Sequence, residues 1–172
     1  MFLLCWTYLD KQSFQQVGKT IMQILKNQEI PVLIHPSEKR YDPIRKIIFG
    51  TNHHPLNADV INNLSEIFKH NNTEIIALHV TEDLEFGKKI KHPKYLKRLK
   101  NETNVNNLKI NAIFTKKRLN RTNLIHSFAI DKDADMIAVL SENEKVAGEK
   151  LRPDVLHRLA AKSELPLMVY SA

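Results

Sequence analysis

Short apolar runs alternate with amphipathic stretches along most of this chain, and this alternation constrains its fold more than any other feature. Two runs, Glu74 to Val80 and Met136 to Leu140, are almost continuously apolar, which is typical of strands buried on both faces. A third run, Leu108 to Phe114, alternates apolar and polar residues, as a more exposed strand does. Because strands that alternate with helices imply right-handed crossovers, the pattern predicts an α/β fold with a mostly parallel sheet.

From residue 46 onward the pattern predicts five parallel strands, with helices on both faces of the sheet. The expected strands are 46–51, 74–80, 108–114, 136–140 and 166–170. The expected helices are 58–70 with Asn57 as its cap, about 93–100, 122–132, and one more before the last strand. In such sheets ligands bind beyond the carboxyl ends of the strands, so functional residues are expected there.

The end of the chain repeats a segment near its start. Residues 29–35, Glu-Ile-Pro-Val-Leu-Ile-His, resemble residues 164–170, Glu-Leu-Pro-Leu-Met-Val-Tyr, and each copy follows a helical stretch. One helix–strand unit found twice indicates an internal repeat. Only the second copy has a whole domain's length of sequence before it. We therefore expect residues 1–40 to be the C-terminal β-α-β fragment of a first repeat, and residues 41–172 to be a complete domain.

The composition of the chain bears on its partners, its disulfide bonds and its relation to membranes. The net charge of +7 permits contact with polyanions, although a basic surface without a partner is more common. The single cysteine, Cys5, excludes a disulfide within the chain. No run reaches the ~18 apolar residues of a membrane span. We expect a soluble, cytoplasmic protein without a membrane partner.

Four motifs in the second part resemble the universal stress protein family. Residues 46–52 stand where that family's first strand ends in a Pro-Val-Asp-Gly-Ser type turn. Leu78-His79-Val80 is similar to the end of its second strand, residues 134–140 to its fourth strand, and residues 166–170 to its last. The resemblance runs from Tyr41 to Ala172. It implies a Rossmann-like fold of the adenine nucleotide alpha hydrolase-like type, and a non-enzymatic role in the stress response.

Nucleotide-binding members of that family carry Gly, two residues, Gly, nine residues, then Gly and Ser or Thr. The same spacing in this chain gives Leu140, Asn143, Pro153 and Asp154, so all four positions differ. Leu140 adds a side chain where the backbone must approach the ligand, and Pro153 lacks an N–H donor. Asp154 places a carboxylate where a phosphate would lie, which repels it by roughly 4 kcal/mol at 4 Å. In the N-terminal fragment, the same spacing begins at Cys5 and gives Cys5, Tyr8, Gly18 and Lys19, so only one glycine remains there.

The resemblance implies that the nucleoside half of the pocket is partly kept. Gly50, Thr51 and Asn52 end the first strand, and Asn52 stands where the family has an aspartate. Val80 would supply an apolar wall for an adenine, and Ser141 ends the fourth strand in the same cleft. We therefore predict a degenerate nucleotide site that holds no cofactor. The alternative is a sensor that binds ATP or AMP.

A basic segment from Lys88 to Lys100, together with 116–121, suggests a second alternative, a module that binds polyanions. Only Phe86 and Tyr95 are interleaved as aromatics, which is few for base stacking, so we do not expect nucleic acid to bind.

Loop histidines and nucleophiles give no further site. His53, His54 and His79 lack the helical spacing of zinc enzymes, so we predict no metal. Ser141 and Cys5 have no base partner suggested by the sequence, so we predict no catalytic residue.

The two copies of the last strand are expected to pair edge to edge, because pairing covers backbone groups that an edge leaves exposed. The pairing would form either an intramolecular pseudo-dimer or a homodimer. The residues of these edges are Pro31, Val32, Leu33, Ile34, Pro166, Leu167, Met168, Val169 and Tyr170.

Overall fold

The computed structural model describes residues 5–7, 30–35, 42–51, 54–82, 92–115, 121–141 and 164–171. The helical stretch expected before residues 29–35 and the helix expected before the last strand both lie outside these residues. So do Asn52, Asn143 and Asp154 of the predicted nucleotide site. In the part of the chain that is described, no helix is long and apolar enough to cross a bilayer.

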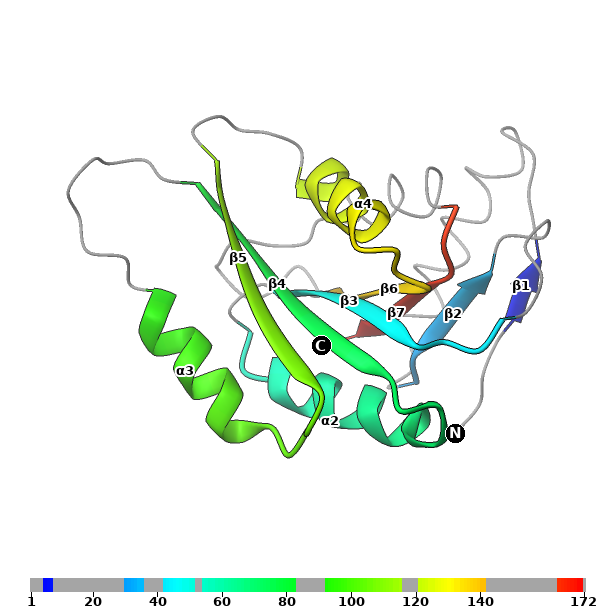
Figure 1. Ribbon diagram of the computed structural model, residues 1–172, viewed down its shortest axis with the longest axis horizontal. Coiled ribbons are helices and arrows are strands. Elements are labelled where there is room, and N and C mark those ends of the chain that lie inside the picture. Colours follow the sequence, from blue (N-terminus) through cyan, green and yellow to red (C-terminus); the bar gives the residue numbers. More distant parts are fainter. Residues whose placement is uncertain are drawn as a thin grey trace.

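The described strands form one sheet in the order β1-β2-β7-β6-β3-β4-β5 (Figure 1). Their bounds are β1 Cys5–Thr7, β2 Val32–His35, β3 Lys46–Thr51, β4 Glu74–Glu82, β5 Leu108–Thr115, β6 Met136–Ser141 and β7 Leu167–Ser171. From β7 to β5 every neighbouring pair is parallel. The predicted α/β fold with five parallel strands is therefore confirmed.

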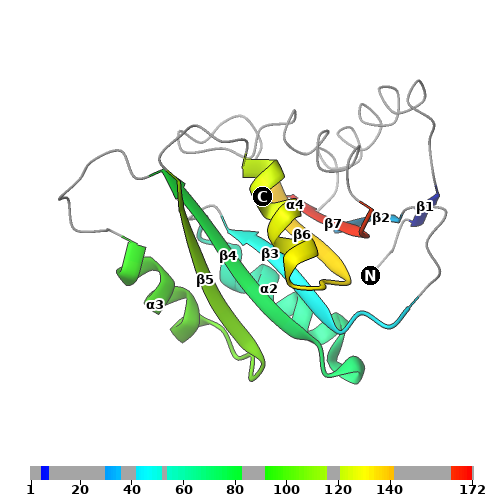
Figure 2. The same cartoon turned by 45° about the horizontal axis from the view of Figure 1, so that its top comes forward.

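Helices cover both faces of this sheet. Figures 1 and 2 show α4 (Arg121–Asp131) on one face, with α2 (Asn57–Ile67) and α3 (His92–Glu102) on the other. A short 3₁₀ turn, Lys69–Asn71, follows α2, and Asn72 then adopts a left-handed conformation with φ 50°. The helix predicted over 58–70 therefore ends as an α-helix three residues early.

The alternation of side chains along β3 divides the interior into two cores. Ile48 packs with Ile125 and Ala129 of α4. Ile47 and Phe49 point to the opposite face and pack in the core that includes α2. Every residue of β6 is buried, which explains its continuously apolar sequence. The edge strand β5 is only partly buried, as its alternating sequence predicts.

Asp135 fastens the start of β3 to the start of β6. Its Oδ2 accepts hydrogen bonds from the backbone N–H groups of Arg45 and Lys46, each at 2.8 Å. The N–H of Asp135 in turn donates to the carbonyl of Lys46 at 2.9 Å. Since hydrogen bonds to a carboxylate are stronger than those between neutral groups, this residue stabilises the junction between the starts of the two central strands.

The prediction that Asn57 caps α2 is wrong. The N-cap is Leu56, and no side chain caps this helix end. Asn57 is the first helical residue and is completely buried, and its Nδ2 donates to Oη of Tyr95 at 2.6 Å. Its side chain is drawn inward because it joins α2 to α3.

The strand β2, from the N-terminal part of the chain, lies beside β7 at one edge of the five-stranded parallel sheet. It pairs antiparallel with β7, with Leu33 directly opposite Met168. The other pairs are Val32 with Val169 and Ile34 with Leu167. β1 then pairs in parallel with β2. Of the two pairings expected from the sequence, this one lies within the chain.

Candidate functional site

The order of the strands locates the place where a ligand would bind. From β3 the chain proceeds to β4 on one side, whereas β6 and β7 lie on the other. In open α/β sheets ligands bind at such a switch point, beyond the carboxyl ends of the strands. Thr51, Val80 and Ser141 lie at or near the ends of β3, β4 and β6. Five predicted site residues, Gly50, Thr51, Val80, Leu140 and Ser141, therefore gather at one end of the sheet.

Gly50 lies where α4 approaches β3 closely. A Cβ added to Gly50 would lie 3.0 Å from Cδ1 of Ile125 and 3.6 Å from Cγ1 of Val139. The first distance is shorter than most Cβ contacts, so the side chain of Ile125 would have to shift slightly to accept a methyl group there. The close approach of helix to strand therefore accounts for this glycine without a ligand, although the sequence pattern had suggested a nucleotide site.

Thr51 is bound to its own sheet. Its Oγ1 lies 3.3 Å from the carbonyl oxygen of Leu78 and 3.1 Å from Nδ1 of His79, its neighbour on β4. If the hydroxyl donates to the carbonyl, it accepts from Nδ1–H of His79. Both side chains are buried, and the His79 residue is only 2% exposed.

His79 and Asn57 meet at Tyr95 of α3. The rings of His79 and Tyr95 lie 5.8 Å apart between centroids, at an interplanar angle of 54°. Asn57 binds the hydroxyl of Tyr95, and Asn57 Oδ1 is buried without a hydrogen-bond partner among the described residues. Thr51, His79 and Asn57, which are buried, thus form with the partly buried Tyr95 a polar cluster beneath the strand ends, called the buried polar cluster below. Sequence reasoning missed Tyr95 as its centre, because no spacing relates α3 to the ends of β3 and β4.

The remaining strand-end residues belong to the two cores. Val80 is 5% exposed and packs in the core that contains Ile125, so the predicted adenine wall faces α4. Leu140 is 1% exposed and packs in the opposite core, which includes Met168 and Tyr170. Ser141 is buried at the end of the same strand.

Tyr170 is held at the same end of the sheet as Leu140, its partner in the pairing of β6 with β7. Its Oη donates to Oδ1 of Asn63 on α2 at 2.9 Å. Burial raises the pKa of the Tyr170 hydroxyl far above its ordinary value. The neutral tyrosine therefore links β7 to α2. It lies next to Leu140, the position at which the phosphate loop would begin.

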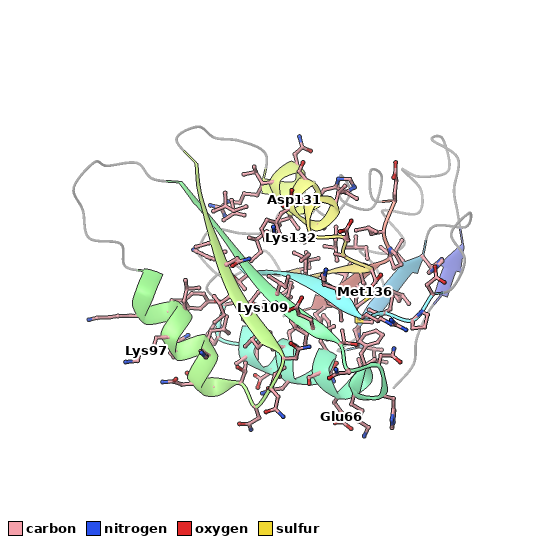
Figure 3. All side chains as sticks on the ribbon, in the orientation of Figure 1. Glu66, Lys97, Lys109, Asp131, Lys132 and Met136 are labelled. Atoms are coloured by element: carbon pink, nitrogen blue, oxygen red, sulfur yellow. The ribbon has the colours of Figure 1, made fainter. Side chains whose placement is uncertain are left out.

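Part of the basic segment lies on the outer side of α3. Lys94, Lys97, Arg98 and Lys100 are exposed, and Figure 3 shows Lys97 on the side of the helix away from the sheet. Arg98 Nε lies 3.4 Å from Oε1 of Glu102, and its guanidinium lies 5.9 Å from the centre of the Tyr95 ring. The rest of the segment, 88–91 and 116–120, lies outside the described residues.

No metal-binding arrangement is present in the described ranges: they contain no group of three or more His, Cys, Asp or Glu residues placed to hold an ion. His54 Nδ1 accepts a hydrogen bond from the N–H of Leu56 at 3.2 Å, while His79 packs against Tyr95. The third histidine considered from the sequence, His53, lies outside the description.

Comparison of sequences gives no relative: no family model matches the chain, and no curated protein matches it. Comparison of structures does. A universal stress protein in complex with cAMP matches 75% of this chain and 98% of its own length, with a TM-score of 0.57 and 11% identity.

Two longer proteins match more of the chain. A universal stress protein from Archaeoglobus fulgidus matches 90% of this chain, with a TM-score of 0.65 and 13% identity. A putative universal stress protein from Pseudomonas aeruginosa matches 98% of it, with a TM-score of 0.54 and 12% identity. This chain spans only 55% and 63% of the lengths of these two proteins. Its strand order and these matches together show that the chain has the fold of the universal stress proteins.

Proposed function

We propose that this chain is a universal stress protein module that works without enzymatic turnover and does not hold ATP. The observation that carries the proposal is the burial of Leu140. A phosphate-binding loop needs a backbone that ligand oxygens approach closely, which glycine permits. Here a leucine that is 1% exposed stands at the first position of the loop and packs in the core.

Opening this position to a phosphate would be costly. Withdrawing Leu140 from the core would expose an apolar side chain, at a cost of about 1.5–3 kcal/mol. Tyr170, opposite Leu140 in the strand pairing, is also buried and hydrogen-bonded to Asn63. Pro153 and Asp154 add a missing donor and a repelling charge in the sequence. These costs add to one another and weaken phosphate binding.

The absence of turnover is proposed from the chemistry of Thr51. This residue and His79 resemble a nucleophile and its base, at 3.1 Å. However, both are buried, and the hydroxyl lies within hydrogen-bonding distance of the carbonyl of Leu78. A pair satisfied in this way serves the sheet and is not directed at a substrate. Two substitutions of Thr51 separate a structural role from a catalytic one: serine keeps the hydroxyl, and valine removes it. We expect both variants to change the stability of the protein and nothing else.

The alternative is an adenine nucleotide sensor. One structure with the same fold contains cAMP, so the fold accepts an adenine nucleotide in that protein. In this chain the described nucleoside-side residues, Thr51 and Val80, are less than a tenth exposed. A sensor would therefore have to move α4 or the buried polar cluster to admit a base.

Thermal unfolding with and without nucleotide tests the proposal. A ligand present at one hundred times its dissociation constant stabilises a protein by about 2.7 kcal/mol. We expect millimolar ATP, ADP, AMP and cAMP to leave the unfolding temperature unchanged. A matched variant carries glycine at 140, 143 and 153 and serine at 154. If ATP raises the unfolding temperature of this variant alone, the four loop positions are the cause of the lost ATP binding. A rise in the natural sequence would support the sensor.

A further inference from the structure

Three lysines on α3 differ from every other lysine in the described part of the chain. Lys94, Lys97 and Lys100 are exposed, and no carboxylate of the described residues forms an ion pair with them. Each of the other described lysines has a partner, either a carboxylate or a backbone carbonyl. These are Lys46, Lys69, Lys109 and Lys132. The described lysines without a partner are therefore gathered on one helix.

These three lysines lie on the side of α3 that faces away from the molecule. Leu99 is buried and Tyr95 is partly buried, and both pack in the core that includes α2. Lys94, Lys97 and Lys100 follow one another in steps of three along a helix, so they form a row about 9 Å long. Figure 3 shows Lys97 pointing away from the sheet. We call this row the lysine face of α3.

The lysine face is unfavourable for the helix that carries it. Lys94 lies near the N-terminal, positive end of the helix dipole, and the first turn of α3 has no acidic residue. Like charges at a spacing of three residues repel one another along the helix. The acidic residue of α3, Glu102, lies near Arg98 and not near the row. A partner that brings negative charge to this face would therefore relieve the repulsion.

We propose that the lysine face of α3 binds an acidic segment of another polypeptide. Carboxylates of that segment pair with Lys94, Lys97 and Lys100. A helical segment suits the row best, because acidic residues at steps of three or four form a matching row on its surface. The proposal does not rest on the loss of ATP binding, since the strand ends take no part in it.

The chemistry of this face favours a polypeptide over a nucleic acid or a membrane. Nucleic-acid binding without sequence preference uses exposed aromatic rings for stacking, whereas the Tyr95 ring lies against His79 and Arg98. A helix that binds a membrane surface presents apolar side chains beside its cations. The exposed large apolar side chains of the described residues are Leu56 and Ile130, and neither lies on α3.

A second copy of this chain is a poor occupant of the lysine face. With a net charge of +7, two copies repel each other. The acidic residues of the described part are also largely engaged within their own chain. Glu66, Glu74, Glu102 and Asp131 each lie beside a lysine or an arginine, and Asp135 binds backbone N–H groups. The acidic segment therefore belongs to a different polypeptide.

Fluorescence anisotropy of a labelled acidic peptide tests the proposal on the full chain. The probe is a repeating Glu-Ala-Ala peptide of about 18 residues, long enough to form a helix. The same peptide with glutamine in place of glutamate is the uncharged control. One protein variant carries Lys94→Gln, Lys97→Gln and Lys100→Gln. The matched variant carries Lys69→Gln, Lys109→Gln and Lys132→Gln, which removes the same number of charges from lysines that have partners. Circular dichroism confirms that both variants are folded.

We expect the acidic peptide to bind saturably and more weakly as salt is raised from about 50 to 150 mM, because exposed charges are screened. The α3 variant should bind about tenfold more weakly, or about 1.4 kcal/mol shared among three exposed ion pairs. The matched variant should change the affinity less than about twofold. The glutamine peptide should not bind.

Three results overturn the proposal. Equal weakening in the two variants would assign the binding to net charge and not to the lysine face. Absence of binding by the acidic peptide at the lower salt concentration would remove the proposed occupant. A DNA duplex or phosphatidylserine vesicles that bind more tightly than the peptide, and lose this binding in the α3 variant, would show that the face serves a nucleic acid or a membrane.

Discussion

Ile125 of α4 packs so closely over Gly50 of β3 that a Cβ on the glycine would lie 3.0 Å from Cδ1 of the isoleucine. We predict that Gly50→Ala lowers the free energy of unfolding by about 1–2 kcal/mol, because it overfills this contact. Ile125→Val removes the atom concerned. Chemical denaturation should show that the double variant is more stable than the two separate losses predict. Simple additivity would contradict the steric explanation.

Asp135 gives a second prediction, through its two hydrogen bonds to the start of β3. Asp135→Asn should lower the free energy of unfolding by about 1–3 kcal/mol, because the amide binds the N–H groups of Arg45 and Lys46 without the charge. The control is Asp133→Asn, which removes the same charge from an exposed residue. Asp133 has φ 49°, a conformation that asparagine tolerates. Urea unfolding should show little change in the control, and equal losses would reduce the effect to net charge.

Tyr170 predicts how stability depends on alkaline pH. Its pKa is raised by burial in the folded state, whereas in the unfolded state it titrates near 10. Its contribution is therefore fully present below pH about 10 and is lost as the pH rises above that value, because the unfolded state then releases the proton more readily.

Tyr170→Phe checks this assignment. The variant loses the hydrogen bond to Asn63, about 1 kcal/mol at neutral pH. It should also lose part of the decline in stability between pH 9 and pH 11.5, measured by denaturant unfolding relative to the natural sequence. An unchanged decline would assign it to other tyrosines or to lysines.

The buried polar cluster predicts different outcomes for two substitutions of Thr51. Thr51→Val keeps the shape but leaves His79 Nδ1 without this hydroxyl, so the free energy of unfolding should fall by about 1–3 kcal/mol. Thr51→Ser keeps the hydroxyl and should cost less. Thermal unfolding of both variants compares them directly. A valine variant as stable as the serine variant would show that the hydroxyl contributes nothing.

The sequence predicts the five parallel strands because burial on both faces requires continuous apolar runs, and 136–140 is such a run. It predicts the pairing of β2 with β7 because matching edges favour it. It does not reveal that Asn57 turns inward, because capping is a local rule and the contact with Tyr95 spans 38 residues.

The candidate site divides in a similar way. Leu140 was predicted to block a phosphate, and the structure adds a buried position in the core. The sequence predicts that Gly50 contacts a ligand, whereas in the structure Ile125 of α4 lies closest to it. Residue spacing in the sequence locates the end of a strand, but it does not show which helix packs over that end. The role of Gly50 could therefore not be predicted.

The most direct test of the central claim is a calorimetric titration of the natural chain with ATP in the presence of Mg²⁺. We predict no saturable heat at concentrations up to about 1 mM, a limit that corresponds to about −4 kcal/mol of binding free energy. Saturable binding with a dissociation constant near 1 μM, about −8 kcal/mol, would contradict the account. It would mean that Leu140 and the covered strand ends still admit a nucleotide.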